Sequence, residues 1–271
     1  MSATRDDRRL IALDIDGTIL LEDGTLTDRV LAAVHRVRDL GHEVTLATGR
    51  SVAMTLPVLD RLGIAPEFVV CCNGAITLRR DSAAPVGYTR VHVETFQPRE
   101  VLSTIRRSLE HAAYAVEDEA GVYRYCGSFP DGSLGGAAEH VEFDDLLDRP
   151  ATRVVVLSPR HGTEEFLEIV ELMGLHQVSY NVGWTAWLDI APDGVNKSTA
   201  AERVRAELGI PRDRVVAVGD GRNDLEFLAW AGAAGRGVAM GQAPRDVQEV
   251  ASEVTGADVD DGLADLLDSI A

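Results

Sequence analysis

The chain has 271 residues, 45% of them hydrophobic, so it can form one large domain or two modest ones around a real core. It carries 26 Lys and Arg against 44 Asp and Glu, and the formal net charge of -18 repels nucleic-acid phosphates and anionic membrane surfaces. We therefore expect neither nucleic acid nor a membrane as a partner, and an anionic ligand would need a local source of positive charge.

Cysteine usage and the N-terminal segment indicate the compartment. The apolar run after the basic N-terminus is interrupted by acids, and no stretch of sequence approaches the length of a membrane span. Cys71, Cys72 and Cys126 are odd in number and include an adjacent pair, so a disulfide framework is not expected. We predict a cytoplasmic protein with reduced thiols, and no sequence feature assigns an oligomeric state.

Short apolar runs alternate with segments of helical period through the first 80 residues. The runs 10–15, 42–49 and 67–74 are predicted to be buried strands, and the segments 27–41 and 51–63 are predicted to be helices. This β-α-β-α-β order with nearly continuous apolar strands is typical of a parallel sheet covered on both faces.

The pattern changes from about residue 85 and resumes near the end of the chain. Helices and antiparallel strands are predicted for the segments 88–93, 98–112, 114–125, 152–158, 163–174 and 178–192. The helix-then-strand order of the opening returns at 197–209, 214–221, 235–241 and 260–271. We therefore predict an α/β fold, with a Rossmann-like doubly wound parallel-sheet core from residues 1–84 and 193–271 and an inserted α/β domain at 85–192.

Polar residues stand where four of the predicted core strands end. They are Asp14-Ile15-Asp16-Gly17-Thr18, Thr48-Gly49-Arg50, Asn73-Gly74 and Gly219-Asp220-Gly221-Arg222-Asn223-Asp224. In an open parallel sheet, ligands bind beyond the carboxyl ends of the strands. We expect the four endings to meet at one edge of the sheet and to form the functional site.

Three aspartates in these endings predict a metal site. Asp14 and Asp16 are two residues apart on one strand, so they can address the same ligand, and Asp220 adds a third acid. Like charges this close do not all stay ionised without a cation, and an all-oxygen site suits Mg²⁺, which takes one or two carboxylates plus a substrate phosphate. An anionic group beside the metal would find a hydroxyl, a cation or close backbone N–H groups at Thr18, Thr48, Lys197, Gly17 and Gly49.

In this order and placement, the segments resemble the four signature motifs of the haloacid dehalogenase superfamily. The matching residues are Asp14-x-Asp16-Gly17-Thr18, Thr48-Gly49-Arg50, Lys197 and Gly219-Asp220-x-x-Asn223-Asp224. The large insert, Asn73-Gly74-Ala75 and the stretch GVAMGQAP at 237–244 resemble the Cof-type sugar phosphatase branch, whose members carry an α/β cap. The resemblance covers the whole chain. It implies a Mg²⁺-dependent phosphatase that hydrolyses small phosphorylated metabolites, such as sugar phosphates, through an aspartyl-phosphate.

The resemblance also implies a role for each matching residue. Asp14 would be the nucleophile, and Asp16 would protonate the leaving alcohol and later deprotonate the attacking water. The metal ligands would be Asp14, Asp16 through its backbone carbonyl, and Asp220, with Asp224 in or just behind the first shell. Phosphate or substrate would be bound by Gly17, Thr18, Thr48, Gly49, Arg50, Asn73, Lys197 and Asn223. Specificity would depend on the cap, notably the 126–136 loop, Asn181, Trp184 and Trp187.

Other interpretations of the same residues stay open. Taken alone, Asp before Gly is common turn chemistry, and Thr48-Gly49-Arg50 fits a helix cap. A phosphotransferase or phosphomutase would pass the phosphoryl group to a second hydroxyl instead of water. A signalling receiver domain also clusters acids, a threonine and a lysine, but it is shorter and lacks an insert. A non-catalytic ligand-binding protein would not need the complete set of Asp14, Asp16, Lys197 and Asp220.

Overall fold

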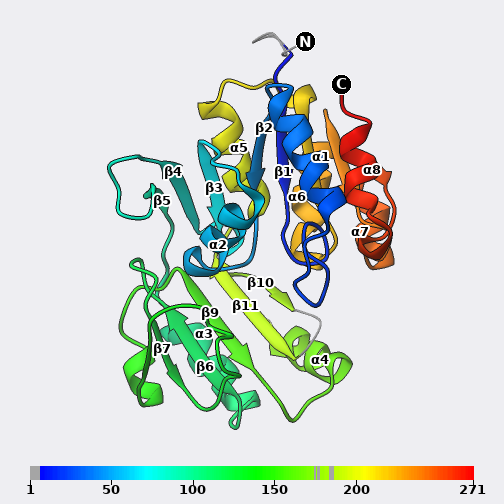
Figure 1. Ribbon diagram of the computed structural model, residues 1–271. Helices are drawn as coiled ribbons and strands as arrows, with labels where there is room; N and C mark the ends of the chain where they lie inside the picture. The colour runs from blue at the N-terminus through cyan, green and yellow to red at the C-terminus, as the bar shows by residue number, and fades with distance from the viewer. Residues whose placement is uncertain (1–6, 174, 176–177, 183–185) are drawn as a thin grey trace.

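The computed structural model describes residues 7–173, 175, 178–182 and 186–271 (Figure 1). The blue N-terminal part and the yellow-to-red C-terminal part lie together in the upper half of Figure 1, and the green middle part forms the lower half. Two segments far apart in sequence therefore build one unit, and the residues between them build the other.

The upper unit contains a five-stranded parallel sheet, which we call the core sheet. Its order is β14-β13-β12-β1-β2, and every neighbouring pair is parallel. The strands are β1 (Leu10–Leu13), β2 (Glu43–Leu46), β12 (Val215–Gly219), β13 (Arg236–Ala239) and β14 (Glu253–Val254). Beyond β2, a parallel bridge between Ala47 and Val70 leads to β3 (Phe68–Cys71), which forms an antiparallel three-stranded sheet with β4 (Ile76–Arg80) and β5 (Tyr88–Val93).

Helices cover both faces of the core sheet because successive strand residues point to opposite sides. On β1, Ile11 and Leu13 belong to the apolar cluster on one face, whereas Leu10 and Ala12 belong to the cluster on the other. The first face packs on α1 (Asp28–Asp39), α2 (Val52–Leu62) and α8 (Gly262–Asp268). The second packs on α5 (Lys197–Glu207), α6 (Leu225–Gly232) and α7 (Arg245–Val250). This is the doubly wound arrangement that the sequence predicts.

The lower unit is a six-stranded sheet, which we call the cap sheet, with the order β10-β11-β9-β6-β7-β8. Its strands are β6 (Ala113–Glu117), β7 (Tyr123–Cys126), β8 (Ala138–His140), β9 (Arg153–Leu157), β10 (Val178–Val182) and β11 (Trp187–Pro192). One face packs on α3 (Arg99–Ser108) and α4 (Thr163–Met173), with Tyr114, Val154 and Ile190 in the shared cluster. Alternate residues of the same strands, such as Ala115 and Val155, belong to a smaller cluster on the opposite face.

Several predicted boundaries differ from those in the structure. Residues 126–148, for which the sequence predicts no helix or strand, contain β8, which pairs parallel with β7 although antiparallel strands are predicted for the inserted domain. Short 3₁₀ turns also occur, at η1 (Cys72–Gly74), η2 (Phe143–Leu146), η3 (Arg212–Arg214), η4 (Arg222–Asp224) and η5 (Asp258–Asp260). Trp184 lies outside the described residues. The core strands are shorter than predicted because their polar ends leave the sheet to form the loops of the site.

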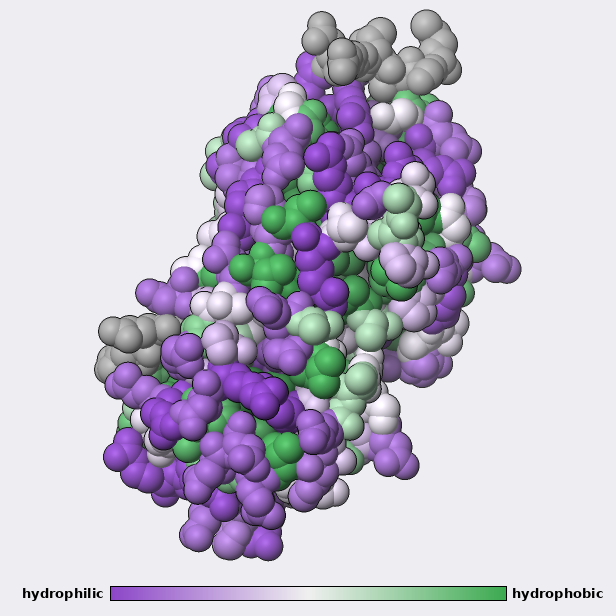
Figure 2. Space-filling view, turned by 90° about the vertical axis from the view of Figure 1, so that its left-hand side faces the viewer, coloured by the Kyte–Doolittle hydropathy of each residue, from purple (hydrophilic) through white to green (hydrophobic). Residues whose placement is uncertain are grey.

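The surface agrees with the composition. The face drawn in Figure 2 is mainly hydrophilic, with scattered apolar side chains. Within the part of the chain that the structure describes, no helix combines the length and apolar character needed to cross a bilayer.

Candidate active site

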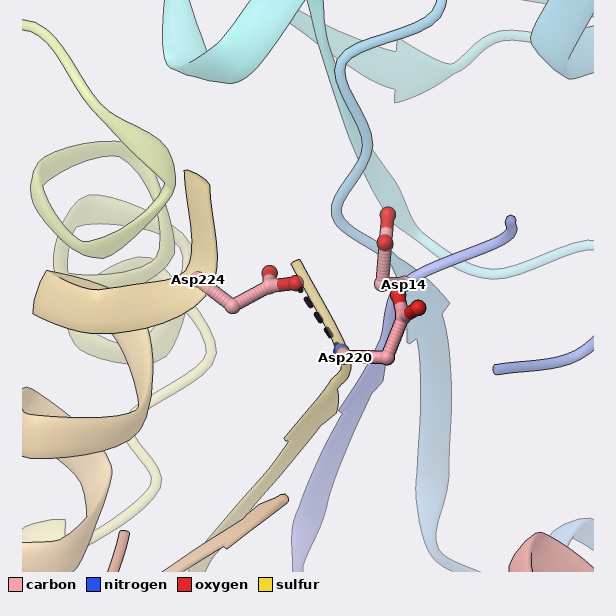
Figure 3. Close-up of side chains that lie close together, drawn as sticks. All are labelled: Asp14, Asp220 and Asp224. Carbon is pink, nitrogen blue, oxygen red and sulfur yellow. Dashed lines mark hydrogen bonds between the residues drawn. The ribbon is translucent and has the colours of Figure 1, made fainter. Parts of the chain in front are cut away.

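Two aspartates extend from neighbouring strands of the core sheet. Asp14 follows β1, where its backbone N–H donates to the carbonyl of Val218 at 2.9 Å, and Asp220 follows β12. Figure 3 shows both side chains at the strand ends, with Asp224 approaching from η4, the turn that leads into α6. Carboxylate oxygens of the three residues lie within 4.8 Å of one another, and all three side chains are buried. The strand endings therefore meet at one edge, as the sequence predicts.

Asp224 is held by donors of its own chain. Its Oδ2 accepts the backbone N–H groups of Asp220 at 3.2 Å and Gly221 at 3.1 Å, and Figure 3 marks the first of these bonds. Its Oδ1 accepts from Lys197 Nζ at 2.7 Å. Both carboxylate oxygens of Asp224 thus accept hydrogen bonds, and through them Asp224 stabilises the loop after β12 that carries Asp220.

Lys197 connects the two sides of the acid cluster. Its fully buried Nζ lies 2.8 Å from Asp14 Oδ1 as well as 2.7 Å from Asp224 Oδ1. It is the first residue of α5, whose N-cap Asn196 accepts from the backbone N–H of Thr199 at 3.0 Å. Burial favours a lower pKa for Lys197, but the carboxylates of Asp14 and Asp224 raise its pKa above the ordinary value. The lysine therefore stays charged in the interior.

A single lysine does not offset the three acids. Burial, together with the charges of neighbouring acids, raises the pKa of Asp14 from its ordinary value of 3.8 to about 7 and that of Asp220 to about 8. Two carboxyls that resist ionisation, with oxygens that converge within 4.8 Å, fit a divalent cation with a preference for oxygen ligands. The donor set thus suits Mg²⁺.

Asp16 lies apart from this cluster. Its side chain is 62% exposed and forms a two-point contact with Arg50, in which Arg50 Nε donates to Asp16 Oδ2 at 2.9 Å. This contact raises the pKa of Arg50. The carboxylate of Asp16 therefore does not belong to the cluster formed by those of Asp14 and Asp220. This agrees with the resemblance, which assigns only the backbone carbonyl of Asp16 to the metal.

Two glycines allow close approach around the acids. Gly17 has a φ of +66°, and a Cβ there would lie 2.2 Å from Asp220 Oδ2. A Cβ on Gly49 would lie 3.1 Å from Asn73 Oδ1, which in turn accepts from Asn223 Nδ2 at 3.1 Å. Asn73 itself has a φ of 50°, in the left-handed region that asparagine tolerates. The motif glycines therefore make space for side chains from other strand ends.

The two predicted threonines are buried. Thr48 Oγ1 accepts from the backbone N–H of Arg50 at 3.1 Å, so it caps the turn into α2. Thr18 is buried, and its Oγ1 has no hydrogen-bond partner among the described residues. A buried hydroxyl without a partner is free to bond a ligand that reaches it.

A cavity of about 300 Å³ opens above the acids, between the core and cap sheets. Seven of the predicted site residues line it: Asp14, Asp16, Gly49, Arg50, Asn73, Asp220 and Asn223. Five others, Gly17, Thr18, Thr48, Lys197 and Asp224, are not among its lining residues. The sequence thus predicts most of the core side of the cavity.

The cap side contains residues that were not predicted. Ser133, Arg153, Trp187 and Asp189 line the cavity from the cap, and of these the sequence points to Trp187 and to the loop that carries Ser133. On the core side Met54, Gly221, Arg222 and Pro244 complete the lining. Gly221 and Arg222 belong to the fourth predicted strand ending, and Pro244 belongs to the stretch 237–244. Arg153 is the first residue of the apolar strand β9, and Asp189 interrupts the apolar strand β11. A charged residue inside such a strand needs a partner, and this signal could have identified the two residues.

Comparison with known proteins identifies the family. The model of the haloacid dehalogenase-like hydrolases matches residues 11–267. This chain belongs to that family. The resemblance carried by the four motifs is thereby confirmed, and with it the expectation that the protein is a hydrolytic enzyme.

Two relatives of this hydrolase are named as phosphatases. It is 27% identical over 272 residues to the 5-amino-6-(5-phospho-D-ribitylamino)uracil phosphatase YitU of Bacillus subtilis, covering 95% of this chain and 96% of the relative. It is 29% identical over 278 residues to the pyridoxal phosphate phosphatase YbhA of Escherichia coli, with 96% and 97% covered.

Solved structures share the fold. The sugar phosphatase BT4131, of haloacid dehalogenase subclass IIB, superposes with a TM-score of 0.78 at 21% identity, covering 96% of this hydrolase and 98% of that chain. The likeness confirms the predicted fold class, a Rossmann-like core with an inserted α/β cap.

Proposed function

We propose that this haloacid dehalogenase-type phosphatase hydrolyses phosphomonoesters of small metabolites, sugar phosphates among them, through a phosphorylated Asp14 and with Mg²⁺ as cofactor. The observation that carries the proposal is the convergence of Asp14, Asp220 and Asp224 around Lys197 at a cavity of about 300 Å³. A cavity of that size suits a small ligand. The named relatives, which act on phosphorylated small molecules, support the same class of substrate.

The metal would be held by Asp14, Asp220 and, on the resemblance, the backbone carbonyl of Asp16. Asp224 would orient Asp220 from behind, because its oxygens already accept from Lys197 and two backbone N–H groups. When bound, Mg²⁺ supplies positive charge that keeps Asp14 ionised and offsets the charge of the phosphoryl oxygens.

The side chains then divide the chemistry between them. Ionised Asp14 attacks phosphorus and forms an oxygen–phosphorus bond, while the bond from phosphorus to the leaving oxygen breaks. Asp16 gives its proton to that oxygen and afterwards takes one from the water that attacks the phosphoryl group and releases Asp14. In the structure Arg50 donates to both oxygens of an ionised Asp16, so this two-point contact has to open before Asp16 can take up the proton that it gives to the leaving group. We propose that Asn73 contacts the edge of the substrate. The phosphoryl group would be bound by side chains and by the backbone N–H groups beside two glycines, namely Thr18, Thr48, Lys197 and Asn223, with Gly17 and Gly49.

The domain division and the cytoplasmic location belong to the same proposal. We assign residues 1–84 and 193–271 to the catalytic core and residues 85–192 to a cap that excludes water and selects the leaving group. The separate strand pairing of the cap sheet supports this division, although the β4–β5 hairpin crosses the boundary at residue 84. The three free cysteines support a reducing compartment.

The test is phosphate release from a panel of sugar, polyol and nucleotide phosphates, with Mg²⁺ or EDTA, by the wild type and by Asp14→Asn. We expect release that requires both Mg²⁺ and Asp14. Analysis of the second product separates hydrolysis from transfer to another hydroxyl. Release that persists in Asp14→Asn or in EDTA would refute the proposed roles.

A further inference from the structure

The face of the cap sheet that is turned away from α3 and α4 carries a shielded ion pair. Arg153 on β9 donates from Nε to Asp189 Oδ1 on the neighbouring strand β11 at 2.6 Å. The two side chains are only 10% and 18% exposed, and both residues line the cavity opposite the catalytic aspartates. An ion pair with so little water around it is held in a defined geometry.

Buried groups fix the arginine from its other side. Arg153 Nη1 donates to the hydroxyl of Tyr123 at 3.1 Å, and that hydroxyl donates to Glu117 Oε2 at 2.7 Å. Tyr123 and Glu117 are fully buried. The thiol of Cys72 also donates to Glu117 Oε2, at 3.5 Å, which links this network to η1 of the core. The guanidinium is therefore positioned before any ligand arrives.

Each arginine that lines the cavity already has a carboxylate partner. Arg50 contacts Asp16, Arg153 contacts Asp189, and Arg222 Nε donates to Asp246 Oδ2 at 2.9 Å. Four aspartates line the same cavity, namely Asp14, Asp16, Asp189 and Asp220. Apart from the phosphoryl group that the catalytic residues hold, a second anion would meet no uncompensated arginine in this described lining and would be repelled by the aspartates.

An apolar wall stands beside the ion pair. Trp187, two residues before Asp189 on β11, lines the cavity together with Met54, and its ring lies 5.9 Å from that of Phe129 at an angle of 77°. Such a wall suits the carbon skeleton of a ligand, whereas the ion pair offers hydrogen-bond donors and an acceptor side by side.

We infer that Arg153 and Asp189 are specificity residues that bind the leaving group, and that this group is neutral and carries hydroxyl or amide groups at its end remote from the phosphate. The inference rests on the proposed function, because it names the class of alcohol released at the same site. It excludes substrates with a second anionic group at that remote end.

Two probes of equal length test this selectivity. Sorbitol 6-phosphate and 6-phosphogluconate share a six-carbon chain and a phosphate but end in a hydroxymethyl group and a carboxylate, respectively. Their dissociation constants are measured by calorimetry in the presence of Mg²⁺, with Asp14→Asn as the background so that no turnover is needed. We expect sorbitol 6-phosphate to bind at least about tenfold more tightly than 6-phosphogluconate.

Variants of Arg153 and Asp189 should shift the ratio of the two dissociation constants in opposite directions. Asp189→Asn leaves the charge of Arg153 uncompensated, so the ratio should shift at least about tenfold towards 6-phosphogluconate. Arg153→Gln removes the charged donor and leaves Asp189, so sorbitol 6-phosphate should bind about tenfold or more weakly and 6-phosphogluconate more weakly still. The binding of inorganic phosphate should stay unchanged in both variants. Asp148→Asn, which removes the exposed partner of Arg99 on the cap, is the matched control and should not alter the ratio.

Three results would overturn the inference. They are equal binding of the two probes by the Asp14→Asn protein, a ratio that neither cap variant moves, and failure of both probes to bind where inorganic phosphate binds. Absence of phosphate release by the wild type from every compound in the panel would instead refute the proposed function. The ratios of the dissociation constants test the role of Arg153 and Asp189 independently of that result, because they are measured without turnover.

Discussion

At the scale of single residues, the site depends on charges that would be unfavourable alone. Lys197 is fully buried at the N-terminal end of a helix, where the helix dipole disfavours a cation, and the carboxylates of Asp14 and Asp224 compensate it. The sequence predicted the members of this cluster, since each lies in a short motif. It did not predict that Lys197 would contact Asp14 and Asp224 directly, because motif spacing does not determine which side chains pair.

Removal of the lysine should therefore destabilise the fold. Lys197→Met leaves two buried carboxylates without a cationic partner, and we expect the free energy of unfolding at about pH 8 to fall by about 3–5 kcal/mol in urea titrations. At about pH 6 the loss should be smaller, because Asp14, whose pKa burial raises to about 7, can take up a proton. Arg245→Ala, which breaks an exposed ion pair with Glu249, is the control and should cost less than about 1 kcal/mol. Equal stability of wild type and Lys197→Met would contradict this account of the cluster.

The raised pKa values give the metal-free protein a defined pH dependence. Burial and the neighbouring acids raise the pKa of Asp14 to about 7 and that of Asp220 to about 8 in the folded state, from an ordinary value of 3.8. Between about pH 4 and pH 8 the folded protein binds more protons than the unfolded chain, so this contribution to stability is lost as the pH rises.

The stability that Mg²⁺ binding adds should increase as the pH rises. Mg²⁺ needs ionised ligands, so the increase in melting temperature on adding Mg²⁺ should be larger at about pH 8 than at about pH 6. The difference should shrink in Asp220→Asn, which removes one of the two acids whose pKa is raised. Thermal melts with Mg²⁺ or EDTA at the two pH values measure this. An increase that is as large at the lower pH would argue against Asp14 and Asp220 as the metal ligands.

At the scale of elements, the parallel strands bring distant motifs together, and the glycines after them set how closely they approach. The meeting of the β1 and β12 ends follows from sequence, because buried apolar strands in β-α-β order imply parallel neighbours whose carboxyl ends share an edge. The opposing cap surface could not be predicted in the same way. The alternation of residues along a strand places Arg153 and Asp189 each on one face of the cap sheet. It does not reveal which of the two faces α3 and α4 cover.

Gly17 and Gly24 provide a matched pair of substitutions. Both have positive φ values, +66° and +80°, so Ala at either position should cost about 1–2 kcal/mol of backbone strain. A Cβ at Gly17 would also lie 2.2 Å from Asp220 Oδ2, whereas nothing lies within 4 Å of a Cβ at Gly24. We expect Gly17→Ala to weaken Mg²⁺ binding by about tenfold or more, as measured by calorimetry, and Gly24→Ala to leave it unchanged. Similar affinities in both variants would refute the proposed approach of Gly17 to the metal site.

At the scale of the whole molecule, the cavity exists because the cap sheet lies opposite the carboxyl ends of the core strands. The loops after β1 and β12 supply Asp14, Asp16 and Asp220, and the cap sheet supplies Arg153, Trp187 and Asp189. The sequence predicted both units from their different hydrophobic patterns. Their relative orientation depends on contacts between residues far apart in the chain, such as that between Cys72 and Glu117, and no local pattern encodes such a contact.

The central claim is that Asp14 carries the phosphoryl group, and the most direct measurement is to trap it there. Asp16→Asn lacks the base that activates water, while p-nitrophenyl phosphate has a leaving group that needs little protonation. The variant should therefore form the intermediate and hydrolyse it slowly, giving a burst of p-nitrophenolate close to one equivalent per active site. Borohydride reduction after quenching, followed by peptide mass spectrometry, should find homoserine at position 14. A burst without that product, or a phosphoryl group on another residue, would contradict the account.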